Sequence, residues 1–292
     1  MIHVQRTFEI SERRACQAIG QPRSTQRYVG QRDDIDSALS SRIIELSQEN
    51  PRYGYRRVWA LLRREGWEVN KKRVLRLWRE QGLKVPEKQH KRRRLRIGSG
   101  ENGVTKRRAE YPNHVWSYDF AMDQTEDGRR LKVMPVVDEY TRECLSLEGQ
   151  RSIKACGVMD TLRRLFIERG EPDYIRSDNG PEFIAEALKE WLAISGVKTL
   201  YIEPGAPWEN AYSESFISRM RDELLERELF VNLKEAQVLL EDYRDHYNHR
   251  RPHGALGYLS PAEFAAIEAL SHQTSGAIGE SKELQSVQRL SS

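Results

Sequence analysis

The chain of 292 residues has no apolar run near the roughly 18 residues that a membrane-spanning helix requires. Its first ten residues also lack the apolar core of a secretory signal. Cysteine is scarce: Cys16, Cys144 and Cys156 are scattered and form no Cys-x-x-Cys pair. These absences argue against a disulfide scaffold and a cysteine-rich zinc module. We therefore expect a soluble intracellular protein, and its length indicates about two domains.

Charge is distributed unevenly along the chain, although the net charge is only +4. Residues 1–110 hold 27 Lys and Arg against 13 Asp and Glu, whereas residues 111–292 hold 21 against 31. The front part therefore carries +14 and the remainder −10. A basic segment of this size is typical of a polyanion-binding region, although solvated helix surfaces produce the same pattern.

The front part is predicted to be helical. Residues 11–28 have the outline of a helix-turn-helix, with Ser11 as the N-cap of its first helix. A second unit, over residues 36–83, shows three amphipathic helices separated by turns. The last of these helices carries basic residues suited to DNA phosphate contacts, among them Lys71, Lys72, Arg73 and Arg76.

A basic segment follows over residues 86–110. It contains a run of charged side chains and almost nothing that could build a core, and the run includes Lys91, Arg92, Arg93 and Arg94. We interpret it as a linker that lies along a DNA backbone, with a purely solvated linker as the alternative.

From about residue 113 the pattern changes to strands and helices. Three strands with short connections are predicted first, and helices then alternate with further strands. The strands are expected at 115–122, 130–137, 144–149, 173–177 and 199–202, and the helices at 155–169, 184–195, 209–225 and 233–246. This order indicates an α/β domain with a mixed sheet. The polar residues 272–292 are expected to form a disordered tail.

Three carboxylates stand out by their positions. Asp119 falls inside a strand that should be buried, where an ionised group is costly unless it is paired or holds a metal. Asp178 follows a later strand, and Glu214 lies on a helix. Taken singly, these residues also fit a strand edge, an Asp-Asn-Gly turn and an ordinary helix surface. Together they could converge at one sheet edge, where oxygen ligands suit two Mg²⁺ or Mn²⁺ ions.

The surroundings of these acids carry a family resemblance. Asp178 lies in Ser-Asp-Asn-Gly-Pro-Glu-Phe, and Glu214, after 35 intervening residues, lies in Asn-Ala-Tyr-Ser-Glu-Ser-Phe. This resembles the DDE core of the retroviral-integrase superfamily, which has a ribonuclease H-like fold. More closely, it is similar to the second-reading-frame transposases of bacterial insertion sequences. Three further segments match that family: Pro51–Arg57, Val69–Val74 and Tyr247–Tyr258.

The resemblance implies the roles of individual residues. Asp119, Asp178 and Glu214 become a metal-binding catalytic triad, and Arg221 and Asn210 on the same helix become candidates for contacting DNA near the site. An ordinary surface arginine is the alternative for Arg221. The competing acids Glu203 and Glu209 do not have the spacing of the family's third acid. His246, His249 and His253 have helical spacing, but Pro252 breaks the helix before the third and no nearby cysteine supports a zinc site, so phosphate contact or packing is expected of them. No zinc module of the retroviral type precedes the core in this sequence.

The family further implies a function. We expect Mg²⁺-dependent cleavage and strand transfer at element ends, with Mn²⁺ as a substitute. The implied partners are double-stranded DNA, at least one further copy of the chain, and an upstream reading-frame product. No membrane is involved, and the location is the bacterial cytoplasm, at the nucleoid. The alternatives are an inactive DNA-binding repressor or remnant, and a phage-like or retroviral-like integrase.

These expectations divide the chain into five parts: a partial helix-turn-helix (1–30), a helical DNA-binding domain (36–85), a basic linker (86–110), a ribonuclease H-like core with a helical extension (111–271) and a disordered tail (272–292).

Overall fold

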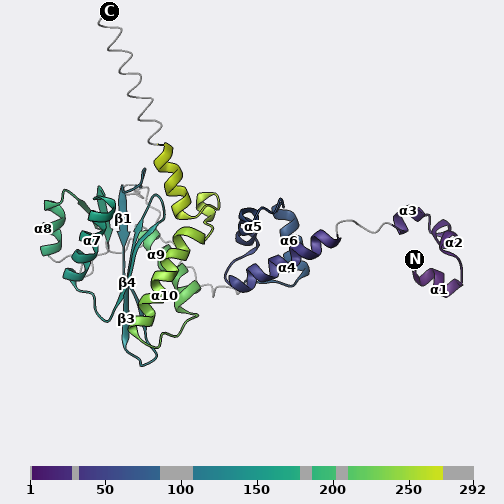
Figure 1. The fold of residues 1–292 in the computed structure, drawn as a ribbon, viewed down its shortest axis with the longest axis horizontal. Coiled ribbons are helices and arrows are strands. Elements are labelled where there is room, and N and C mark those ends of the chain that lie inside the picture. The colour runs from purple at the N-terminus through teal and green to yellow at the C-terminus, as the bar shows by residue number, and fades with distance from the viewer. Residues whose placement is uncertain (1, 28–32, 86–107, 178–185, 202–209, 272–292) are drawn as a thin grey trace, which may run out of the picture. The chain divides into compact units, whose positions relative to one another are not determined.

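The computed structural model describes residues 2–27, 33–85, 108–177, 186–201 and 210–271. The chain divides into two compact units, Met1–Pro86 and Glu87–Ser292 (Figure 1). Expected positions that lie outside the described residues include Asp178, the linker residues 91–94 and the tail 272–292. Within the described ranges, no helix is both long enough and apolar enough to cross a membrane.

The first unit is helical. Its N-terminal part forms short helices, which include one over residues 2–8 that the sequence pattern did not predict. Ser11 caps the second of them by accepting a hydrogen bond from the Arg14 N–H, as predicted. The helices are α1 (Ile2–Phe8), α2 (Glu12–Ala18), α3 (Arg23–Gln26), α4 (Asp33–Glu49), α5 (Tyr55–Arg64) and α6 (Lys71–Glu80).

Helices α4, α5 and α6 share one apolar core. Leu39, Ile43 and Leu46 follow the spacing of one helix face and are buried on α4. They pack against buried side chains of α5 and α6, namely Val58, Leu62, Val74, Leu77 and Trp78. The amphipathic pattern of this segment therefore predicted its three helices correctly.

The second unit is built on a mixed sheet. The strands follow the order β4-β3-β1-β5-β6, with β2 paired to β3 on the same side as β1. β3 runs antiparallel to β1, whereas β1, β5 and β6 are parallel to one another. The α/β prediction is therefore confirmed, and this is a ribonuclease H-like arrangement. The strands are β1 (Val115–Tyr118), β2 (Ala121–Gln124), β3 (Arg130–Asp138), β4 (Cys144–Gln150), β5 (Tyr174–Ser177) and β6 (Lys198–Tyr201).

Helices cover both faces of this sheet (Figure 1). One face, with Trp116 and Ile175, packs against α7 and α8. The other, with Val133, packs against α9 and α10. The helices are α7 (Ala155–Arg169), α8 (Glu186–Ile194), α9 (Ala211–Met220) and α10 (Leu233–Asp245).

The strand predicted over residues 115–122 is interrupted at Asp119. β1 and β2 pair with β3 in one continuous register, which places Asp119 opposite Pro135. The Glu139 N–H donates to the Val115 carbonyl, so alternate residues of β3, Pro135 among them, direct their backbone toward this strand. Proline has no N–H to donate, and the ladder is therefore broken at the position of Asp119.

Two helices end in π-helical turns that the sequence pattern did not predict. Arg221–Leu225 continues α9 and His246–Arg250 continues α10. A buried ion pair joins these regions: Arg251 donates to the two carboxylate oxygens of Glu223 at 2.7 and 2.6 Å. The wider turns thus place two oppositely charged side chains together inside the fold.

A side chain at the second π-helical turn holds the beginning of β4. The Asn248 amide accepts from the Cys144 N–H and donates to the Cys144 carbonyl, both at 2.9 Å. The family-like segment Tyr247–Tyr258 thus contributes structural contacts to the sheet.

Removing the charge of Arg251 should destabilise this unit. We expect Arg251→Met to lower the free energy of unfolding by about 3–5 kcal/mol, because Glu223 would remain buried without its partner. Arg244→Met is the matched control: Arg244 pairs with Glu241, whose side chain is 61% exposed, and its loss should cost less than about 1 kcal/mol. Differential scanning calorimetry of the full chain measures both, and equal shifts in the two variants would contradict the assignment.

Candidate active site

Asp119 lies at the break between β1 and β2 and is half-buried. It therefore does not lie within a continuous buried strand, as the sequence pattern predicts, and Pro135 gives the physical reason. One carboxylate oxygen accepts from the Phe120 N–H at 2.7 Å. The position combines a rigid strand end with a side chain that reaches solvent.

Helix α9 brings a second part of the site to Asp119. Asn210, at the N-cap position of α9, donates from its side-chain nitrogen to the Asp119 Oδ2 at 3.3 Å. The Asn210 Oδ1 is buried and has no hydrogen-bond partner among the described residues. A buried, unsatisfied acceptor beside a carboxylate is a position where a donor or a cation is stabilising.

Glu214 follows Asn210 by one helical turn. Its side chain is exposed, yet partial burial raises its pKa above the ordinary value for glutamate. Loss of hydration is the only cause of this rise, so no lysine or arginine of the described part of the chain offsets it.

The third predicted acid, Asp178, lies outside the described residues, and so do the competing acids Glu203 and Glu209. Strand β5 ends at Ser177, one residue earlier, and its Arg176 is in register with Ser117 of β1. Asp119 and Asp178 each come two residues after this pair in the sequence. Within the described residues no three acidic, histidine or cysteine side chains form a metal-ligand group.

Asp119 and Glu214 carry the ligand type that a divalent cation takes. Carboxylate oxygens are the hard ligands that Mg²⁺ takes in proteins, usually one or two of them together with the substrate phosphate. The unsatisfied Asn210 oxygen beside Asp119 agrees with such an occupant.

Arg221 begins the first π-helical turn and reaches the strand that follows Asp119. Its guanidinium donates to the carbonyl of Met122 in β2 at 3.1 Å. The contact connects the end of α9 to the strand that begins two residues after Asp119.

A charged cluster that contacts β5 and α9 was missed by the sequence analysis. Glu139, just after β3, accepts from the Nε of Arg176 at 2.9 Å, and both side chains are almost fully buried. Burial raises the pKa of Glu139 to about 7, while the charges of Arg176 and Arg142 act in the opposite direction. Arg142, in the β3–β4 turn, lies 3.9 Å from the ring centre of Tyr212 on α9. The one signal in the sequence is proximity: Arg176 comes two residues before Asp178, and Tyr212 comes two residues before Glu214.

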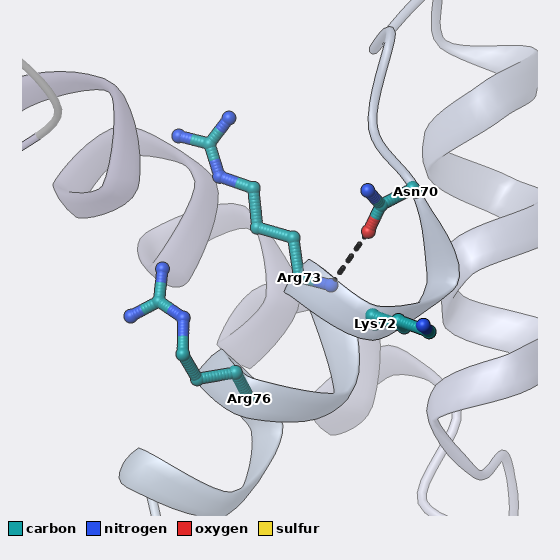
Figure 2. A pocket seen from close by; sticks show the side chains of 4 residues that line it. All are labelled: Asn70, Lys72, Arg73 and Arg76. Carbon is teal, nitrogen blue, oxygen red and sulfur yellow. Dashed lines mark hydrogen bonds between the residues drawn. The ribbon is translucent and has the colours of Figure 1, made fainter.

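Three of the four predicted DNA-contacting residues of α6 line a depression of about 490 Å³, and Lys71 does not (Figure 2). Asn70 caps the helix by accepting from the Arg73 N–H at 2.8 Å, and Lys72, Arg73 and Arg76 complete the lining. Backbone N–H groups and basic side chains at a helix N-terminus favour a phosphate.

Most of these cations also have partners within the protein. Asp36 of α4 binds both Arg73 and Arg76, at 2.7 and 2.6 Å, and these bonds lower the pKa of its carboxyl. The Lys71 ammonium lies 4.4 Å from the Trp59 ring centre. Lys72 is exposed, and no partner for it appears in the described part of the helical unit.

The three C-terminal histidines have no metal-site geometry among the described residues. His253 is buried against the Tyr247 ring, and His249 pairs with Asp245. Burial lowers the pKa of His246. Packing accounts for His253.

Family models match both the helical unit and the sheet-containing unit. Models of the integrase core domain match residues 109–207 and 195–261, and an HTH-like domain matches residues 34–93. Similar solved structures include the HTLV-2 integrase catalytic core in complex with magnesium, at 15% identity and a TM-score of 0.43, covering 53% of this chain and 97% of that one. The BIV integrase catalytic core is similar at 22% identity and a TM-score of 0.40, covering 56% and 98%.

Curated relatives cover nearly the whole chain. A 31.7 kDa protein of insertion element IS407 from Burkholderia multivorans is 41% identical, over 91% of this chain and 94% of the relative. The putative transposase InsK of IS150 from Escherichia coli is 30% identical, over 83% and 89%. The InsD transposase of IS2 from Escherichia coli is 31% identical, over 80% and 79%. The chain therefore belongs to the second-reading-frame transposases of bacterial insertion sequences, DDE polynucleotidyl transferases that combine an HTH-like domain with an integrase core.

Proposed function

We propose that Asp119, Asp178 and Glu214 are the carboxylates with which this transposase cleaves DNA at the ends of its element and joins them to a target. The contact between Asn210 and Asp119 supports this most directly, because it brings the helix of Glu214 to the strand of Asp119. The buried Asn210 Oδ1, which has no hydrogen-bond partner among the described residues, agrees with a cation beside Asp119.

The integrase core implies dependence on a divalent metal. We infer two ions, with Mn²⁺ able to replace Mg²⁺. When bound, they supply activation of the attacking oxygen and stabilisation of the leaving 3′-oxygen. The protein then needs no covalent nucleophile of its own for either reaction.

The side chains around the triad have distinct tasks in this proposal. Asn210 orients the carboxylate of Asp119 through the 3.3 Å hydrogen bond. Arg221, held beside β2 by the Met122 carbonyl, presents a positive charge for a DNA phosphate near the site. In cleavage, water attacks the phosphorus and the bond to the 3′-oxygen breaks. In joining, the freed 3′-hydroxyl attacks a target phosphodiester, and one P–O bond again replaces another.

DNA binding follows from the HTH-like and integrase domains. We infer that Lys72 and its neighbours on α6 contact phosphates, and that the basic residues Lys91, Arg92, Arg93 and Arg94 follow the backbone. Because two ends must be joined in one reaction, copies of the chain assemble on DNA. An upstream reading-frame product is a further inferred partner, and the nucleoid is the inferred location.

Replacing Glu214 should abolish catalysis while leaving the helix intact. Glu214→Gln keeps the size of the side chain and removes its charge, so we expect nicking and joining of a plasmid carrying the element ends to fall at least about 100-fold in Mg²⁺. Asp119→Asn should behave in the same way. The measurement is the yield of nicks and new junctions with and without Mg²⁺.

A matched substitution separates the site from the general surface. Glu168 is an exposed glutamate on α7, and Glu168→Gln should retain parental activity. Equal activity of the parent and Glu214→Gln would show that the site lies elsewhere. If the parent itself is inactive, adding the upstream product distinguishes a missing partner from an inactive core.

The phosphate role of Lys72 can be measured through salt. We expect Lys72→Ala to weaken binding to element-end DNA and to reduce the slope of log K against log salt by about one. Arg63→Ala on α5 removes an equally exposed charge and should leave the slope unchanged. Fluorescence anisotropy across a salt series provides both slopes, and identical slopes for the parent and Lys72→Ala would rule out a phosphate contact.

A further inference from the structure

The turn between β3 and β4 is held by several hydrogen bonds to Asp138. Asp138 accepts from the N–H groups of Tyr140 and Thr141 with one oxygen and from the Asn113 N–H with the other. The backbone of Asp138 is also bonded to Arg142 and Glu143. These hydrogen bonds make the turn rigid, and the turn lies beside the start of β1.

Two charged side chains of this turn contact different elements of the unit. Glu139 reaches β5 and binds Arg176, which comes two residues before Asp178. Arg142 reaches α9 and stacks on Tyr212, which comes two residues before Glu214. The same turn thus contacts both chain segments from which the second and third carboxylates extend.

Arg142 is held in an unfavourable backbone conformation to do this. Its φ is 67°, in the left-handed region that favours glycine. Its Nη1 is buried with no hydrogen-bond partner among the described residues. A strained, incompletely bonded arginine persists where the surrounding structure holds it, and such residues concentrate at functional sites.

We propose that Glu139 and Arg142 are positioning residues, which set the end of β5 and the first turn of α9 relative to the rigid turn and so fix the distance between the carboxylates. This rests on the proposed triad. The charged groups themselves do not touch the DNA or the ions. Their effect is on geometry, because a metal site tolerates little displacement of its ligands.

Tyr212 provides the most direct test, since it is half-buried on the outer side of the cluster. Tyr212→Leu removes the aromatic face and keeps an apolar side chain, whereas Tyr212→Phe keeps the face. We expect Tyr212→Leu to weaken Mn²⁺ binding to the full chain about tenfold, as changes around metal ligands do, and Tyr212→Phe to restore it to within about twofold. Electron paramagnetic resonance of free Mn²⁺ measures binding without requiring activity.

A second pair of variants acts from the turn. Arg142→Met removes the other partner of the stack, and Arg163→Met removes a charge from an exposed position on α7. We expect weaker Mn²⁺ binding only in Arg142→Met, together with a higher Mg²⁺ requirement for cleavage. Circular dichroism shows whether each variant is folded, so the second pair gives the answer if Tyr212→Leu is not.

Glu214→Gln separates this proposal from the triad itself. If Glu214→Gln loses Mn²⁺ binding while folded Tyr212→Leu and Arg142→Met bind as the parent does, the positioning role is wrong and the triad stands. If Glu214→Gln binds Mn²⁺ like the parent, the triad is wrong and the positioning role fails with it. Loss in Tyr212→Leu and Arg142→Met with retention in both controls supports the role.

Discussion

The packing of α9 on the sheet is the interaction from which the geometry of the site follows. Phe216 and Met220 are buried against the sheet face that holds Val133 and Ala121. Each large apolar side chain buried in this way contributes about 1.5–3 kcal/mol. Because this face of the helix is held by its core, the residues at its N-terminal end, Asn210 and Glu214, have little freedom relative to Asp119. The contact of Asn210 with Asp119 is thus a consequence of apolar packing about two to three turns further along the helix.

Much of the fold follows from sequence pattern because apolar spacing reports burial. Leu39, Ile43 and Leu46 predicted their helix, and the helix over residues 155–169 begins and ends where it was expected. The interruption at Asp119 was not expected, since it depends on which residue β3 places opposite. Only the register reveals that this residue is Pro135. Similarly, the spacing of apolar residues did not reveal the two π-helical turns.

The site was predictable in part for a different reason. Asp119 was predicted from its place in a strand and Glu214 from the motif around it, whereas Glu139 and Arg142 belong to no motif that indicates their partners. Their contacts cross from β3 to β5 and from the turn to α9, and a linear pattern carries no information on such pairs. The same holds for Asp36, whose two arginine partners lie 37 and 40 residues away in the chain. Pairings of this kind are decided by the fold alone.

The amide of Asn248 has a consequence for how copies of this protein meet. β4 is at the outside of the sheet, and an open strand edge is a template for pairing with another chain. Asn248 occupies the backbone groups of Cys144 at one end of β4, and Gln237 of α10 donates to the Gly149 carbonyl at the other. Backbone groups at both ends of this edge are thus already hydrogen-bonded to side chains and are not available to pair with a strand of another chain. If copies of this chain assemble on DNA as proposed, this protection directs their association to other surfaces and away from the sheet-to-sheet pairing that leads to aggregates.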